Sequence, residues 1–255
     1  MIGRIEEDYT TLSQAAARHV YERIQKRSRI TLGLATGDTP LGLYRELLRL
    51  HQEHPINTGM LTTFNLDEYV GEAPGSPHSY RYYMNKHLFV PLGIPLAQTH
   101  VPNGLAPNIE AECERYEVSI ETCGGVDLQI LGVGRNGHIG FNEPGTSLDS
   151  YTHEVALSPS TREANAKHFG SIANVPHSAI TMGIASILRA REILLLASGR
   201  QKAEAMRHLF EGDTVTNDWP VTVLKKHPAV YVLMDKDAIA MLSDETIENL
   251  ISYSR

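Results

Sequence analysis

The middle of the chain carries a hydrophobic run that ends in a cluster of glycines. Residues 126–145 read VDLQILGVGRNGHIGFNEPG, and within them 128–133 has the pattern of a strand that is covered on both faces. Four glycines, from Gly132 to Gly140, then fall within nine residues, a density that permits positive φ angles and close approach of the backbone. In open α/β sheets, ligands bind at loops beyond the carboxyl ends of strands. The stretch therefore predicts a buried parallel strand followed by a ligand-binding turn.

This glycine-rich turn contains the two groups that an acid/base site needs. These are a histidine, His138, and a carboxylate that can orient or charge it, Glu143, while Asn136 and Asn142 add neutral donors. The alternative is a glycine-rich connector with a solvated histidine, which would be the better interpretation of a short GxGxxG-like string. The second half of the motif, HIGFNEP, favours a site.

Two other turns have the composition of anion-binding sites. TGDTP follows an expected strand at 30–35 and precedes an amphipathic helix, so free N–H groups, the helix dipole and the hydroxyls of Thr36 and Thr39 would face one point. An ordinary helix start, with Thr39 as N-cap and Pro40 in the first turn, explains the same residues without a ligand. In SGRQKA, Lys202 opens a helix, where a lysine is unfavourable for the dipole unless an anion lies between them.

A pair of carboxylates, Asp67 and Glu68, follows the strand expected at 61–66. Adjacent residues of a strand point to opposite faces, so at most one of the two can enter a pocket while the other faces a neighbouring element. From the residues alone, a solvated or helix-capping acidic pair is favoured over a catalytic one.

Strands and helices alternate along the chain. Strands are expected at 30–35, 61–66, 128–133, 152–157, 192–197 and 229–234, with one or two more short ones. Helices are expected at 9–26 (capped by Thr10 or Thr11), 79–90, 110–122 and 244–252, and a turn and helix at 176–188. The prediction is an α/β fold, a Rossmann-like open, mostly parallel sheet with helices on both faces, in a single domain over 1–255.

Composition and charge exclude several classes of protein. The chain is 42% hydrophobic and 21% charged, as in ordinary globular domains, and its formal net charge of -7 argues against nucleic acid or an acidic membrane surface as a partner. The turn after the first expected strand is TGDTP instead of GxGxxG, which excludes NAD. Cys113 and Cys123 have no histidine at metal-ligand spacing, so neither a metal nor another cofactor is expected. An acidic N-terminus and the lack of ~18 consecutive apolar residues predict a cytoplasmic protein.

The motifs LGLATGDTP, FNLDEYVG, GVGRNGHIGFNEP, GRQKA and PAVYVLMD together resemble the glucosamine-6-phosphate deaminase family, over nearly the whole chain. The resemblance implies an enzyme of amino-sugar catabolism that converts D-glucosamine 6-phosphate and water into D-fructose 6-phosphate and ammonia. It implies the catalytic residues Asp67, Asn136, His138 and Glu143. It also implies the substrate-binding residues Thr36, Gly37, Thr39, Tyr80, Lys167 and Lys202.

The same resemblance implies a role for each catalytic residue. Asp67 would move a proton between sugar carbons, and His138 would open the pyranose ring with Glu143 orienting it. Asn136 stands where many members of the family have an aspartate, which leaves Glu143 as the acidic partner of the histidine. Residues 153–182 would form a mobile lid, whose Lys167 reaches the substrate phosphate. Asp38 stands where many members have a small residue, and its carboxylate would repel a phosphate unless it points away.

Two other functions share this sequence pattern. A 6-phosphogluconolactonase would hydrolyse a sugar lactone on the same fold, but NEP and LDEY favour the deaminase. A non-enzymatic sugar-phosphate sensor need not keep both Asp67 and His138. The hexamers in the family bind an activating sugar phosphate through an arginine and a lysine, and this chain has His153 and Val155 at those places. A neutral histidine and a valine cannot hold a dianion, which predicts a monomer or small homo-oligomer without such activation.

Overall fold

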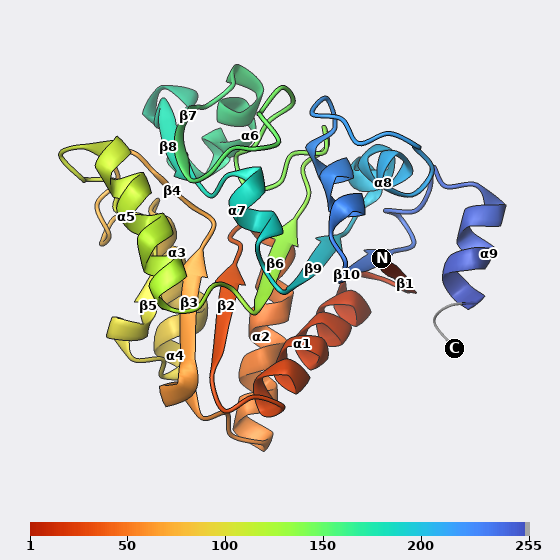
Figure 1. The fold of residues 1–255 in the computed structure, drawn as a ribbon, viewed down its shortest axis with the longest axis horizontal. Helices are drawn as coiled ribbons and strands as arrows, with labels where there is room; N and C mark the ends of the chain where they lie inside the picture. Colours follow the sequence, from red (N-terminus) through yellow and green to blue (C-terminus); the bar gives the residue numbers. More distant parts are fainter. Residues whose placement is uncertain (253–255) are drawn as a thin grey trace.

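Seven strands form a parallel sheet through the middle of the molecule (Figure 1). The computed structural model describes the backbone of residues 1–252 and their side chains, except those of Ser160, Ala164, Asn165, Lys167, His168, Ile251 and Ser252. In sheet order the strands are β1 (Ile2–Glu6), β10 (Val230–Asp235), β9 (Glu192–Ala197), β6 (Leu128–Gly132), β2 (Ile30–Leu34), β3 (Leu61–Asn65) and β5 (Thr99–His100), and all neighbours pair in parallel. The expected α/β fold with a Rossmann-like sheet is confirmed.

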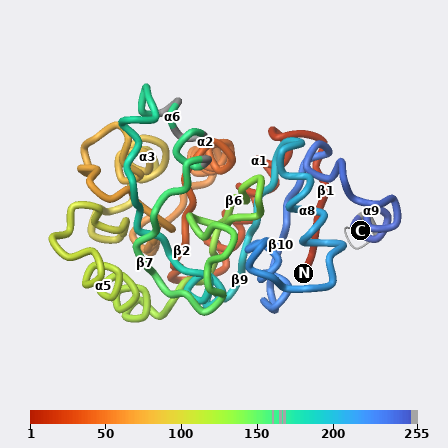
Figure 2. The backbone as a smooth tube through the Cα atoms, turned by 90° about the horizontal axis from the view of Figure 1, so that it is seen from above, coloured from red at the N-terminus to blue at the C-terminus, as the bar shows by residue number. Residues whose placement is uncertain are grey.

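The central strands are apolar because helices cover both faces of the sheet. Alternate side chains enter two different cores: Ile130 and Leu194 pack with α1 (Tyr9–Gln25) and α2 (Asp38–Glu53), whereas Leu131 and Leu195 pack with residues of the opposite layer. That layer comprises α5 (Ile109–Thr122), α7 (Ile184–Leu188), α8 (Ala203–Phe210) and α9 (Asp244–Ser252). Figure 2 shows α1, α2 and α3 (Tyr80–Met84) on one side of the sheet and α5 on the other. A π-helical turn, Asn85–Phe89, joins α3 to α4 (Val90–Leu92).

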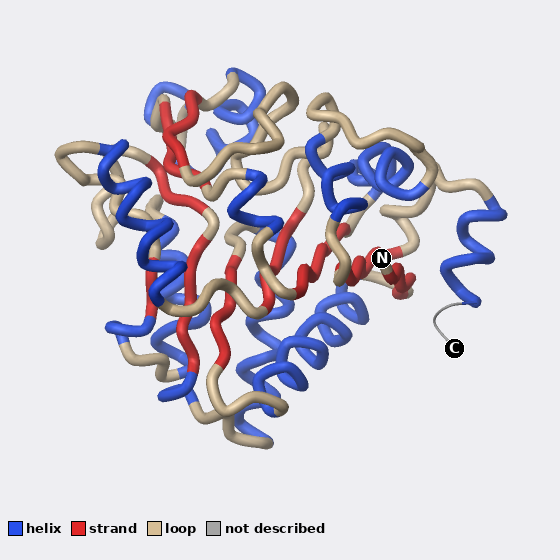
Figure 3. Tube along the Cα trace, viewed as in Figure 1, coloured by secondary structure: helices blue, strands red, loops and turns tan. Residues whose placement is uncertain are grey.

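A small second sheet lies above the carboxyl edge of the large one (Figures 1 and 3). Its antiparallel strands are β4 (Asp67–Tyr69), β8 (Ser178–Thr181) and β7 (His153–Ala156), in that order. With helix α6 (Pro159–Phe169) it encloses a core of its own, made of Tyr69, Phe141, Leu157, Phe169, Val175 and Ala179. This layer covers the carboxyl ends of the central strands.

The structure corrects four expectations. Four short strands (β1, β4, β5 and β8) join the six expected ones in the described residues, more than the one or two predicted. The strand expected at 152–157 is β7, which pairs in the small sheet instead of the parallel one. Residues 176–188 contain β8 before the helix α7, where only a turn and helix were expected. The cap of α1 is Asp8, whose carboxylate accepts the N–H of Thr11 at 2.8 Å.

The strand order reverses between β2 and β6. From β2 the chain continues outward through β3 to β5, whereas from β6 it continues through β9 to β10 on the other side. The loops that leave these two neighbouring strands diverge, which opens a crevice at their carboxyl ends. No described helix has the length and apolar content that a membrane crossing requires.

Candidate active site

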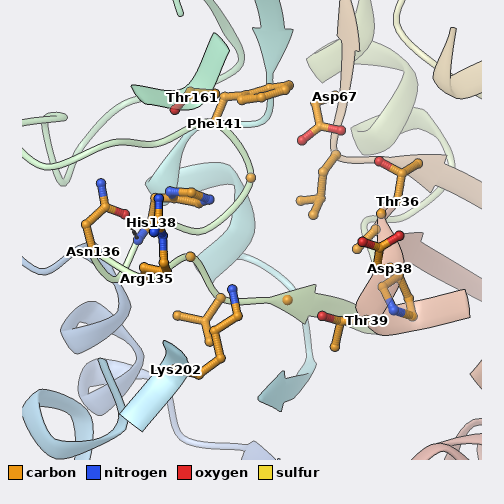
Figure 4. A pocket seen from close by; sticks show the side chains of 18 of the residues that line it. Thr36, Asp38, Thr39, Asp67, Arg135, Asn136, His138, Phe141, Thr161 and Lys202 are labelled. Carbon is orange, nitrogen blue, oxygen red and sulfur yellow. Dashed lines mark hydrogen bonds between the residues drawn. The ribbon is translucent and has the colours of Figure 1, made fainter. Parts of the chain in front are cut away.

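A cavity of about 880 Å³ opens at the carboxyl ends of β2 and β6 (Figure 4). Its walls come from the TGDTP turn, from Leu66 and Asp67, from the glycine-rich turn, and from the start of α8. The lining residues include Thr36, Gly37, Asp38, Thr39, Asp67, Tyr80, Arg135, Asn136, His138, Thr161, Lys202 and Trp219. The chain therefore brings most of the predicted site residues together, although they are spread over more than 160 positions of the sequence.

One wall of the cavity is the start of α2. Gly37, with φ 93°, is the N-cap of this helix, and no side chain caps it, so the ordinary helix start with Thr39 as N-cap is wrong. The first N–H groups of a helix have no carbonyl partners within it, and they lie at the positive end of its dipole. Asp38 is the first residue of α2 and lines the cavity. The wall offers N–H and hydroxyl donors to an anion.

Lys202 faces this helix start from the opposite wall. Figure 4 shows its amine directed into the space that Thr39 also borders. It ends a 3-10 turn, Arg200–Lys202, directly before α8. Burial lowers the pKa of Lys202, and the charge of Arg135 lowers it further. Within the part of the chain that the structure describes, the ammonium group has no hydrogen-bond or ion-pair partner. A half-buried cation without a partner indicates an anionic ligand.

The glycine-rich turn presents His138 to the cavity. A Cβ atom on Gly134 would lie 2.3 Å from the imidazole ring, so only glycine permits the ring to pack over this backbone. The ring Nδ1 is buried and makes no hydrogen bond, but it lies 3.6 Å from Oε1 of Glu143. The backbone N–H of His138 donates to the side-chain oxygen of Asn136 at 3.3 Å. Glu143 thus lies on the Nδ1 side of the ring, and His138 lines the cavity.

Glu143 lies behind His138 and does not line the cavity. Its Oε2 accepts the amide of Asn136 at 2.7 Å, and its Oε1 accepts the hydroxyl of Thr161 at 2.5 Å. Burial raises the pKa of this carboxyl, but His138 and the hydroxyl and amide donors outweigh it and bring the pKa to about 2. Glu143 is therefore ionised at every physiological pH, and Asn136 is its partner instead of a second acid beside the histidine.

Asp67 occupies the other side of the cavity, at the start of β4, and its side chain is buried. Burial raises the pKa of Asp67, and the neighbouring charge of Glu68 raises it further, to about 8. Glu68 points the other way, where it accepts the N–H groups of Tyr69, Tyr80 and Arg81 at 2.9 to 3.0 Å. The adjacent carboxylates are thus divided as strand geometry predicts: one in the pocket and one at the start of α3.

Two hydrogen bonds hold the glycine-rich turn against residues 181 and 182, next to the strand of Asp67. β4 pairs Asp67 with Thr181 of β8, and the Thr181 hydroxyl accepts the N–H of Phe141 at 3.1 Å. A Cβ atom on Gly140 would lie 2.9 Å from the same hydroxyl and 3.7 Å from Oδ2 of Asp67. Asn142, expected as a donor in the site, instead donates to the carbonyl groups of Ile139 and Met182, both at 2.8 Å.

The structure places the predicted residues in three groups. Thr36, Gly37, Thr39, Asp67, Tyr80, Asn136, His138 and Lys202 line the cavity, and Glu143 supports it from behind. The side chain of Lys167 lies outside the described residues. Arg135 and Thr161 line the cavity and were not predicted. Trp219 also borders the cavity, and its ring stacks on His208 with the ring centroids 4.0 Å apart. In the described chain no three metal-ligating side chains gather where an ion could bind.

Comparisons with known proteins point in one direction. The family model described as glucosamine-6-phosphate isomerases/6-phosphogluconolactonase matches residues 6–232. A glucosamine-6-phosphate deaminase from Geobacillus sp. (strain WCH70) is 53% identical over 238 residues, which are 93% of this chain and 94% of that protein. The structure of a monomeric glucosamine-6-phosphate deaminase superposes with a TM-score of 0.92 at 48% identity, covering 94% of this chain and all of that one. A 6-phosphogluconolactonase from Thermotoga maritima has a TM-score of 0.73 at 24% identity, covering 92% of this chain and 99% of that one, a likeness of fold alone.

Proposed function

We propose a mechanism for a chain that belongs to the glucosamine-6-phosphate deaminase family and converts D-glucosamine 6-phosphate and water into D-fructose 6-phosphate and ammonia. The observation that supports the mechanism is the layout of the cavity. A cation and a helix start lie at one end, and a histidine and a buried carboxyl lie at the other. A sugar phosphate has the matching polarity, with an anion at C6 and the reacting carbons C1 and C2 at the far end.

The phosphate binds between the start of α2 and Lys202. The N–H groups of the helix start and the Thr36 and Thr39 hydroxyls are suited to phosphate oxygens, and the ammonium group supplies the compensating charge. A phosphorylated substrate does not cross a membrane unaided, which supports a cytoplasmic location for the enzyme.

His138 opens the pyranose ring. Its Nε2 takes the proton of the C1 hydroxyl and gives a proton to the ring oxygen as the bond between C1 and that oxygen breaks, which forms the open-chain aldehyde. Glu143, ionised and 3.6 Å from Nδ1, stabilises the imidazolium form and fixes the plane of the ring. Asn136 contributes by holding Glu143 in place.

Asp67 then transfers a proton between two carbons. Its carboxylate removes the proton from C2, and the aldehyde oxygen gains a proton from the ammonium group of the substrate, which gives an enolamine. Asp67 then returns its proton to C1, and the nitrogen lone pair forms an iminium group at C2. Water adds to this carbon and ammonia leaves, so that the ketone of fructose 6-phosphate forms. The raised pKa of Asp67 makes it a stronger base than an exposed aspartate, and the ammonium group of the substrate favours its ionised form.

Ammonia release separates this reaction from lactone hydrolysis. Purified protein is expected to release ammonia from glucosamine 6-phosphate, and to leave 6-phosphogluconolactone at its spontaneous rate of hydrolysis. Catalysed lactone hydrolysis without ammonia release would contradict the mechanism.

We also propose that the chain is a single domain whose residues 153–182 close over the cavity as a lid. Within this segment, the hydroxyl of Thr161 at the start of α6 donates to Glu143, so the lid directly contacts the residue that lies behind His138. Arg162 donates to the carbonyl groups of Ile172 and Val175, at 3.0 and 3.1 Å, and so ties the segment to itself. Lys167 would add a cation to the phosphate from this lid. Hydrogen exchange in 153–182 that is unaffected by fructose 6-phosphate would argue against closure.

Replacing Lys202 by alanine is expected to weaken sugar-phosphate binding by ~10-fold to 100-fold, because a half-buried charge-assisted contact to the phosphate is lost. Affinity for the unphosphorylated sugars stays nearly unchanged. Titration calorimetry with fructose 6-phosphate and with fructose measures both. Arg200→Ala is the matched control, since it removes a cation from the same turn but from an exposed position outside the cavity. Equal weakening of both ligands would show a folding defect instead.

We expect a monomer or small homo-oligomer with hyperbolic kinetics. In β7, His153 bonds through Nδ1 to the Tyr151 carbonyl at 2.7 Å, and Glu154 accepts the Ser178 hydroxyl at 2.6 Å, so an anion meets a carboxylate and a valine there instead of two permanent cations. A site that does not bind an effector cannot shift an equilibrium. Sedimentation and initial rates with and without N-acetylglucosamine 6-phosphate test this. A sigmoidal curve that becomes hyperbolic with the effector would refute it.

A further inference from the structure

Three consecutive carbonyl groups at the start of α2 accept hydrogen bonds from tyrosine hydroxyls. Tyr83 of the α3 region donates to the Gly37 carbonyl at 2.7 Å. Tyr9, the first residue of α1, lies 2.8 Å from the Asp38 carbonyl and 3.2 Å from that of Thr39. Both tyrosines approach the turn from outside the cavity, since neither lines it. Two helices thus hold the carbonyl side of the turn that we assign to the phosphate.

The Tyr9 hydroxyl also accepts a hydrogen bond from this helix. The N–H of Gly42 donates to it at 2.8 Å, so one hydroxyl bridges the acceptor and donor sides of the first turn of α2. Gly42 must be glycine here, because a Cβ atom would lie 2.1 Å from the Ser13 hydroxyl and 2.9 Å from the Tyr9 oxygen. The Ser13 hydroxyl is itself held by the Tyr9 carbonyl at 2.7 Å. The first turns of α1 and α2 are therefore in direct contact, as Figure 1 shows for the two helices.

The geometry of the peptide bond relates these carbonyl contacts to the cavity side of the turn. In a trans peptide the C=O of one residue and the N–H of the next point in opposite directions, and the described chain has no cis peptide. The carbonyls of Gly37 and Asp38 point to the tyrosines, so the N–H groups of Asp38 and Thr39 point away from the tyrosines, and both residues line the cavity. A hydrogen bond to a carbonyl also polarises its peptide and strengthens the N–H as a donor.

We propose that Tyr9 is a positioning residue for the substrate: with Tyr83, its hydroxyl holds the carbonyl side of residues 37–39 so that the Asp38 and Thr39 N–H groups face the phosphate. This inference rests on the proposed phosphate site. It makes affinity for the C6 phosphate depend on a helix that contributes no residue to the cavity wall. The proton transfers at Asp67 and His138 take place at the other end of the substrate and do not depend on it.

Tyr9→Phe removes the hydroxyl and keeps the ring that packs between the helices. We expect a KM for glucosamine 6-phosphate that is ~3-fold to 10-fold higher with kcat nearly unchanged, since one bridging hydroxyl is lost. The inhibition constant of inorganic phosphate should rise by the same factor, while affinity for fructose stays constant. Tyr9→Phe combined with Tyr83→Phe should raise KM by at least the product of the two single effects.

Tyr21→Phe is the matched control. Tyr21 lies on the same helix α1, and its hydroxyl donates to the His54 carbonyl at 3.3 Å, at the far end of α2. This variant loses a tyrosine-to-carbonyl bond between the same two helices without touching the phosphate turn, so its KM should equal that of the wild type. Thermal unfolding of all variants checks that the helices still pack.

The outcomes separate this proposal from the mechanism on which it rests. If Lys202→Ala weakens phosphate binding and Tyr9→Phe does not, the positioning role is wrong and the phosphate site stands. If neither variant changes the preference for phosphorylated ligands, the phosphate site itself is wrong. An equal loss of kcat, an equal loss of fructose affinity, or the same change in Tyr21→Phe would show general distortion and overturn the proposal.

Discussion

Asp67→Asn is expected to lower kcat by ~100-fold to 10,000-fold, because the amide cannot accept the proton from C2. Binding of fructose 6-phosphate should remain within a few-fold of the wild type, since the phosphate contacts lie at the other end of the cavity. Ammonia release measures the first effect and titration calorimetry the second. Near-normal turnover in this variant would refute Asp67 as the base.

The pKa of about 8 for Asp67 predicts a pH dependence of both the activity and the stability of the wild type. In the wild type, kcat/KM should rise with pH through about 8 as Asp67 of the free enzyme ionises. The same residue should destabilise the fold at high pH. The pKa of Asp67 is raised above the ordinary value of 3.8, so its contribution to the free energy of unfolding is fully present below pH 3.8. This contribution is lost as the pH rises towards 8.

Asparagine has no such ionisation. Asp67→Asn should therefore be more stable than the wild type above pH 8, by an amount on the order of a few kcal/mol, and the difference should vanish near pH 4. Thermal unfolding at both pH values measures this. An inactive variant that is also less stable at pH 9 would attribute the lost activity to misfolding instead.

His138→Gln is expected to reduce kcat/KM for the cyclic substrate by ~100-fold or more, because glutamine offers a hydrogen bond but no proton at the ring oxygen. A substrate analogue that is already in the open-chain form avoids this step, so its turnover should fall far less. Comparing the two substrates with the same preparation of enzyme provides an internal control for folding. Equal losses on both would show that ring opening is not the task of His138.

Much of the fold follows from local pattern. β2, β6 and β9 are continuous buried runs because helices cover them on both faces, and such runs are readable without a structure. β1 is an edge strand of alternating exposure in the first residues, and β8 has only four residues, so neither contrasts enough with its surroundings to be predicted. The sequence pattern of β7 predicts a strand, but the sheet that β7 joins is decided by its pairing with β8.

The chemistry of the site was also predictable in part. Asp67, His138 and Lys202 each follow a strand, and parallel strands bring the loops at their carboxyl ends to one edge of the sheet. Residue types at those loops therefore indicate what the pocket contains. The family resemblance then selected Asp67 over Glu68, a choice that the residues alone did not favour.

The amino-acid order thus specifies which elements form and which groups reach the edge of the sheet, because both depend on neighbours within a few positions. The environment of those groups arises only on folding. Thr161 bonds to Glu143 from 18 positions away, and Tyr9 reaches the α2 turn from 29 positions away. Asp67 acquires its high pKa from burial by several elements. Hydrogen bonds and desolvation depend on distances of a few ångström between distant segments, and packing, not sequence spacing, sets those distances.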